Sequence, residues 1–164
     1  MSHLVGHTGT EMPGSRKHRS TGRTAGAIAA LISARDEAAL QMAAETIGGW
    51  WFGGAGGVFP DSLEPATSSH HRNMFHGAAL NALGARYAVG NCRAIQEVLR
   101  LEAASHFAAA ESSLDFIGWV LHTTAGLFLH FLAGGVVGFP VGILSHLCLD
   151  YGSPRGIPLL VRGF

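Results

Sequence analysis

The chain has 164 residues, a length typical of one domain. Charged residues are only 13 % of it, and 11 basic residues balance 11 acidic ones, so the charge gives no general attraction to nucleic acid. Its two cysteines lack motif spacing, which argues against a disulfide scaffold and against a cysteine-based zinc site. The ten histidines are the compositional anomaly.

Residues 1–23 form a polar, basic N-terminal segment that includes Arg16-Lys17-His18-Arg19. They contain no apolar run of signal-peptide length, so we expect no cleaved signal. The basic cluster suits either a solvated tail or the cytoplasmic flank of a membrane segment. A single helical domain is expected over residues 24–164.

The first half of that domain is rich in alanine and glycine. Residues 24–46 favour helix through their alanine content, with a charged interruption at Arg35-Asp36-Glu37. Residues 47–60 are Gly-rich and aromatic, and they connect this helix to Pro60 and Asp61. Within them Trp50 and Trp51 suit the core or a membrane-interface belt, and we favour the core.

Two further helices are expected before the most apolar stretch. Residues 76–89 predict a helix that ends at Gly90-Asn91, and residues 92–111 predict an amphipathic helix. Residues 116–149 then contain no Asp, Glu, Lys or Arg, which exceeds the roughly 20 residues needed to span a bilayer. Gly134-Gly135 and Pro140 divide this run, so we expect helices over 115–133 and 139–151. They suit a membrane hairpin or the buried centre of a soluble bundle.

A cluster of metal-ligand side chains follows the Gly-rich stretch. Carboxylates and imidazoles are ligands for zinc, manganese and iron, and here they gather within about 20 residues. The cluster consists of Asp61, Glu64, His71 and His76. We expect His71 on a loop and His76 in the first turn of the next helix, because a straight helix would place them far apart in angle. The alternative is a solvated polar loop.

A second pair of polar side chains lies at the end of the apolar run. His146 and Asp150 are four apart and share one helical face, where polar groups are costly unless paired or ligated. The simpler interpretation is a hydrogen bond between the two. His122 and His130, also in this run, are expected to be satisfied core or pore-lining histidines rather than ligands.

Three motifs together resemble the YdjM-like family of predicted inner-membrane metal-dependent hydrolases, which is distantly similar to zinc-dependent phospholipase C and P1 nuclease. The motifs are Phe59-Pro60-Asp61-Ser62-Leu63-Glu64, His71-Arg72-Asn73-Met74-Phe75-His76-Gly77, and the run from Ser145 to Leu160 with His146, Asp150, Pro154 and Pro158. His18 stands where the family has an early histidine. The sequence departs from the family at Glu64, Phe75 and Gly77.

The sequence thus predicts an all-α helical bundle with membrane-embedded or membrane-associated helices. Its expected ligands for one or more divalent metals are His18, Asp61, Glu64, His71, His76, His146 and Asp150. Zinc is the first expectation, with manganese and iron open. The resemblance implies hydrolysis of a phosphodiester or phospholipid-type ester by metal-activated water. Asp61 or Glu64 would bridge metals or take the water proton, and Arg72 would hold a phosphate oxygen.

The same resemblance implies a membrane location, the inner membrane if the protein is bacterial, with membrane lipid as partner and a homo-oligomer as an option. One alternative is a non-catalytic membrane or assembly protein with a structural metal site. Another is a channel or ion carrier lined by His122, His130 and His146.

Overall fold

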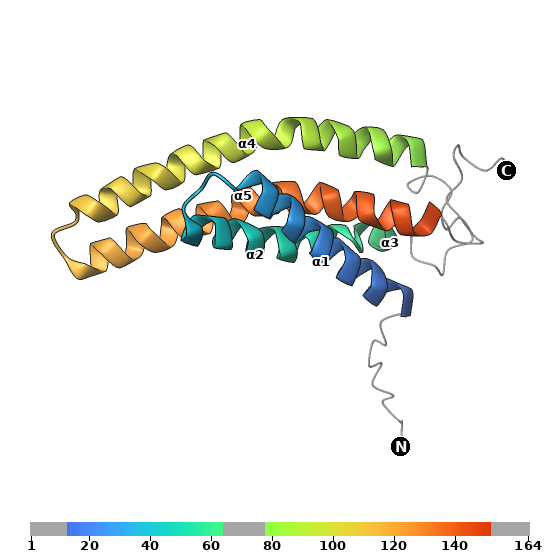
Figure 1. Ribbon diagram of the computed structural model, residues 1–164, viewed down its shortest axis with the longest axis horizontal. Helices are drawn as coiled ribbons and strands as arrows, with labels where there is room; N and C mark the ends of the chain where they lie inside the picture. Colours follow the sequence, from blue (N-terminus) through green and yellow to red (C-terminus); the bar gives the residue numbers. More distant parts are fainter. Residues whose placement is uncertain (1–12, 64–77, 152–164) are drawn as a thin grey trace, which may run out of the picture.

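The computed structural model describes residues 13–63 and 78–151, and over these ranges the chain is helical without strands. The helices are α1 (Pro13–Ser33), α2 (Ala39–Gly56), α3 (Phe59–Leu63), α4 (Ala78–Ser112) and α5 (Phe116–Tyr151). Helices α4 and α5 run antiparallel along the length of the molecule, and α1 and α2 pack beside α5 (Figure 1). The predicted all-α class is confirmed.

The first two helices are longer than the sequence pattern predicted. Helix α1 begins at Pro13 rather than at residue 24, in keeping with the preference of proline for the first position of a helix. It ends at Ser33, so the predicted break at Arg35-Asp36-Glu37 is confirmed. The Gly-rich stretch expected to be a connection instead belongs to α2.

Two predicted helix breaks were wrong. Helix α4 continues through Gly90 and Asn91, where the Asn91 side chain donates to the Tyr87 carbonyl one turn back. An exposed glycine costs a helix only about 1 kcal/mol relative to alanine, which a long helix tolerates. Helix α5 likewise continues through Gly134-Gly135 and Pro140, so the division into 115–133 and 139–151 does not occur.

A thiol compensates for the proline in α5. Because Pro140 has no N–H, it cannot donate to the Val136 carbonyl four residues earlier. The Cys92 Sγ of α4 lies 3.0 Å from that carbonyl oxygen and donates to it. Burial raises the pKa of the Cys92 thiol, which keeps it protonated as a donor.

The start of α5 is capped by Asp115, whose Oδ1 accepts the Gly118 N–H at 2.7 Å.

Glycines four residues apart bring α1, α2 and α5 into backbone contact. A Cβ atom built on any of them would crowd or overlap atoms of a neighbouring helix. Helix α2 runs antiparallel to α1 and parallel to α5, and all three pack on one another in the small-xxx-small manner of membrane helices. We call this contact the glycine seam; it consists of Gly22 and Gly26 of α1, Gly49 and Gly53 of α2 with the following Gly57, and Gly134, Gly138 and Gly142 of α5.

Large apolar side chains lie on the outside of all four long helices. Trp50 is 40 % and Trp51 is 61 % exposed, so the expectation that they are core residues was wrong. Glycines occupy the packed face of α2, which turns Trp50 and Trp51 outward. The Arg23 guanidinium lies 4.2 Å from the Trp50 ring centre. By length and composition α5 is the one described helix able to cross a membrane, a property shared by core helices of soluble proteins.

Gly53→Ala should destabilise the protein by about 1–3 kcal/mol, because its methyl group would overlap the Gly22 carbonyl and separate α1 from α2. Gly90→Ala is the matched control, since a Cβ there meets no atom within 4 Å and should stabilise α4 by up to about 1 kcal/mol. Chemical unfolding of both variants measures the difference. Equal effects would show that the seam is not tightly packed.

Candidate metal centre

Four of the seven predicted metal ligands meet at one end of the bundle. His18 comes from the first turns of α1, Asp61 from α3, and His146 and Asp150 from the end of α5. These helix ends lie together at the right of Figure 1. The other predicted residues, Glu64, His71, Arg72 and His76, lie outside the described part of the chain.

The polar atoms of the cluster converge. One ligand atom from each of His18, Asp61 and His146 lies within 4.8 Å of the other two. The His146 Nε2 lies 3.7 Å from Asp61 Oδ1 and 3.4 Å from Asp150 Oδ2, and the His18 Nε2 lies 3.3 Å from Asp150 Oδ1. The two imidazole rings are 4.0 Å apart between centres. Asp150 therefore contacts both histidines, and Asp61 approaches His146 from α3.

The backbone of α2 fixes the orientation of His146. Its Nδ1 lies 2.8 Å from the Gly57 carbonyl oxygen, which can only accept, so Nδ1 carries the proton. In the neutral imidazole the lone pair is then on Nε2, the atom that faces Asp61 and Asp150. A backbone carbonyl that holds the outer nitrogen of a histidine is the usual outer-shell arrangement of a metal ligand.

The glycine seam explains why these residues meet. Two site residues continue, at a four-residue spacing, the glycine series of their own helices: His18 precedes Gly22 in α1, and His146 follows Gly142 in α5. Asp61 of α3 follows Gly57, the residue just after α2, by the same spacing. Side chains four apart lie on one helical face, so the first larger residue beyond the last glycine is directed between the same helices. The close approach of three backbones thus places three polar side chains together.

Helix α3 presents Asp61 to the buried part of the cluster. The Phe59 ring packs on the Phe139 ring of α5, with 5.3 Å between centres, and Pro60 is buried. The Asp61 side chain is 28 % exposed, whereas the His146 side chain is fully buried. The cluster is therefore buried on the α1 and α5 sides and reaches solvent at Asp61.

The donor set fits a divalent metal. Two imidazoles and two carboxylates are ligands for zinc, manganese and iron, and thiolate ligands are not needed. The Nδ1 of His18 is buried and has no hydrogen-bond partner among residues 13–63 and 78–151, a costly state for an imidazole nitrogen. Ligation or a further contact would remove that cost.

A second buried polar cluster, which the sequence did not reveal, lies at the other end of the glycine seam. Glu45 of α2 is completely buried and accepts from Arg100 Nε at 2.8 Å and Nη2 at 2.7 Å. His130 Nδ1 of α5 lies 2.8 Å from Glu45 Oε1, and Arg100 also donates to the Ser33 carbonyl of α1. The hydrogen bond with Glu45 raises the pKa of Arg100 above its ordinary value. The Glu45 carboxylate joins α2, α4 and α5, and Arg100 links α1 to them through the Ser33 carbonyl.

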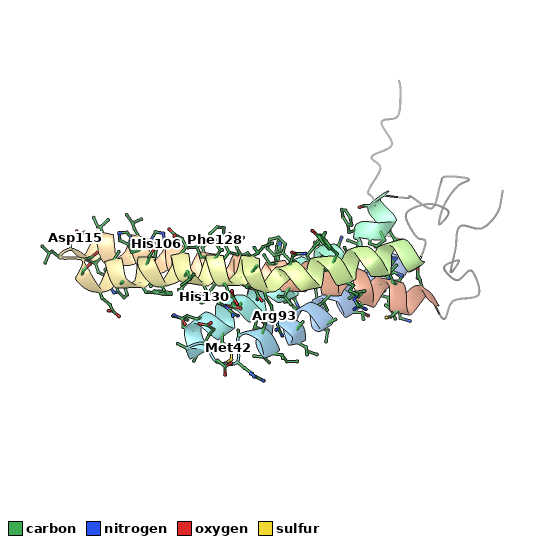
Figure 2. All side chains as sticks on the ribbon, turned by 90° about the horizontal axis from the view of Figure 1, so that it is seen from above. Met42, Arg93, His106, Asp115, Phe128 and His130 are labelled. Atoms are coloured by element: carbon green, nitrogen blue, oxygen red, sulfur yellow. The ribbon has the colours of Figure 1, made fainter. Side chains whose placement is uncertain are left out.

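The signal for this second cluster is the glycine spacing. Glu45 precedes Gly49 and His130 precedes Gly134 by four residues, whereas Arg100 appears in the sequence as part of the polar face of an amphipathic helix. His130 is a hydrogen-bonded core histidine, as predicted. His122 pairs instead with His106 of α4, with 3.0 Å between their Nδ1 atoms, nearer the Asp115 end of the molecule (Figure 2). His122, His130 and His146 thus make three separate contacts.

No protein-family model, curated protein or solved structure matches this chain.

Arg100→Ala should destabilise the protein by about 3–5 kcal/mol, because it leaves the buried Glu45 carboxylate without its bidentate partner. Arg35→Ala is the control: its ion pair with Asp36 is exposed, and its loss should cost less than about 0.5 kcal/mol. Unfolding free energies of the two variants make the comparison. Similar small losses would mean that Glu45 is not held as an ion in the folded protein.

Proposed function

We propose that this protein is a membrane-associated, metal-dependent hydrolase of phosphodiester or phospholipid-type ester bonds. The observation that carries the proposal is the convergence of His18, Asp61 and His146 from three helices, with ligand atoms within 4.8 Å of one another. The order of the motifs, which resembles that of the YdjM-like family, supports the reaction class.

Each described residue has a separate role in this proposal. When bound, a divalent ion would supply Lewis acidity and a nucleophilic water at neutral pH. His18 and His146 would hold the ion, while Asp150 and the Gly57 carbonyl orient the two rings. Asp61 is the carboxylate of the cluster that reaches solvent, so it is placed to accept a proton from an entering water.

The apolar exterior supports the membrane part of the proposal. Monomeric soluble proteins seldom expose large contiguous apolar patches, yet here such side chains lie on every long helix. Examples on α5 are Phe116, Ile117, Leu121 and Phe128, each more than half exposed. Together with the glycine contacts, they suit helices that pack tightly against one another and face lipid.

Purified protein should contain roughly one to three divalent ions, and His146→Ala should weaken metal binding by roughly 10–100-fold or more, because it removes a proposed ligand. His122→Ala is the matched control, since it deletes a hydrogen-bonded imidazole from the same helix. Elemental analysis and metal titration of both variants provide the measurement.

Equal metal loss in the two variants would place His122 in the metal site or reveal a general loss of structure. Unchanged metal content in both would mean that His146 and Asp150 are only a hydrogen-bonded pair. The second result would remove the basis of the proposed function.

Asp61→Asn should lower kcat by roughly 10²–10⁴-fold on a phosphodiester such as p-nitrophenyl phosphorylcholine, because the amide cannot accept the water proton. The metal content should change less than in His146→Ala, since the other proposed ligands remain. Steady-state rates of the metal-loaded protein test this. Wild-type protein that holds its metal but shows no turnover, with either this substrate or phospholipid vesicles, would instead favour a structural metal site in a non-catalytic membrane protein.

A further inference from the structure

A cavity of about 660 Å³ lies between α4 and α5, with Phe52 of α2 at its edge. This volume is within the range of about 300–1,000 Å³ that is usual for small-molecule sites. Only Asn91 and Cys92 among its lining residues carry polar side chains, and the Cys92 thiol is already bonded to the Val136 carbonyl. The walls therefore favour an apolar ligand.

The cavity follows the face of α5 that leads to the candidate metal centre. Its lining residues Leu132, Phe139 and Ile143 are spaced by seven and four residues, and His146 and Asp150 continue the series by three and four. Such spacing keeps all five on one side of a helix. Leu132 to Ile143 extends about 16 Å along α5 at 1.5 Å per residue, and Ile143, the last α5 residue that lines the cavity, precedes His146 by three residues.

Contacts at the two borders of the cavity define its ends. At the metal-centre end the Phe139 ring, which lines the cavity, packs on Phe59 just before Asp61. On the outer side Ile95 of α4 lines the cavity and is 49 % exposed, so the space opens on the apolar exterior. The Phe59–Phe139 contact thus adjoins both the cavity and Asp61, while the open side of the cavity is apolar.

We propose that this cavity holds one acyl chain of a lipid whose ester or phosphate group lies at His18 and His146. The assignment rests on the proposed function for the identity of the polar end, and on the cavity itself for the chain. An acyl chain fits because the cavity walls are apolar apart from Asn91 and Cys92, the cavity opens toward the exposed apolar surface, and the polar cluster begins at His146, three residues after the last α5 lining residue. An acylated phospholipid is therefore the preferred substrate class, and a water-soluble phosphodiester would occupy only the polar end of the site.

Photolabelling with a phosphatidylcholine that carries a diazirine on one acyl chain tests the proposal. In vesicles, mass spectrometry should find labels on cavity residues such as Ile95 and Leu132, and excess unlabelled lipid should compete them away. Labels on outward residues such as Ile117 and Phe128 should not saturate, because they report only lipid around the protein.

Gly84→Phe should reduce the saturable labelling roughly tenfold or more, because Gly84 lines the cavity and a Cβ there meets no atom within 4 Å. Gly90→Phe is the control, since Gly90 is equally open but does not line the cavity. Ala88→Phe, which also lines the cavity, should act like Gly84→Phe and guards against misfolding of a single variant.

Photolabelling of metal-free protein and of the Asp61→Asn variant tests the acyl-chain site separately from the proposed hydrolase activity. Both should keep the saturable labelling, because the acyl chain needs only the cavity walls. Labelling that persists without any turnover would overturn the hydrolase proposal alone. Three results would overturn the acyl-chain site. The first is labelling that never saturates, the second is equal labelling of Gly84→Phe and Gly90→Phe, and the third is the replacement of labelling by crosslinks between two copies.

Discussion

Direct contact between helix backbones is the constraint on which the rest of this structure depends. At the glycine seam the peptide groups of α1, α2 and α5 touch without intervening side chains. Glycine is a poor helix former, so α2 gains its stability from this packing rather than from its own sequence. The apolar side chains that would normally fill a core are left on the outside, as Trp51 shows.

The seam also decides where polar groups are placed. Where a glycine series ends, the next residue at the same spacing still points between the helices but now has a side chain. One end carries His18, Asp61 and His146, and the other carries Glu45 and His130. At one end, both oxygens of the buried Glu45 carboxylate accept hydrogen bonds from Arg100 or His130, which holds the helices together. At the other end, the Asp61 carboxylate reaches solvent. The same packing therefore produces a structural cluster and a candidate reactive one.

Much of the fold could be predicted from sequence, because alanine content and a 34-residue run without charge specify helices independently of tertiary contacts. The continuity of α5 could not be predicted, since it depends on the Cys92 thiol, 48 residues before Pro140. This thiol donates a hydrogen bond to the Val136 carbonyl. His146 and Asp150 were recognisable from their spacing within one helix. Glu45 was not, because its partners Arg100 and His130 come from other helices, and each resembles an ordinary residue of its own segment. The exposure of Trp50 could not be predicted either, because it follows from the packing of the α2 glycines on α1 and α5, which no local pattern reveals.

The parallel pairing of α2 with α5 also governs the order in which the chain can assemble. His146 bonds to Gly57 across 89 residues and His130 to Glu45 across 85, whereas α1 and α2 adjoin through a short turn. Contacts this distant in sequence form slowly, because a long loop must close before they contribute. During synthesis the α1–α2 hairpin is therefore complete while one side of its glycine face still lacks α5. Of the four side chains at the candidate metal centre, His18 of α1 and Asp61 of α3 are therefore synthesised early, and the cluster becomes complete only when α5 adds His146 and Asp150.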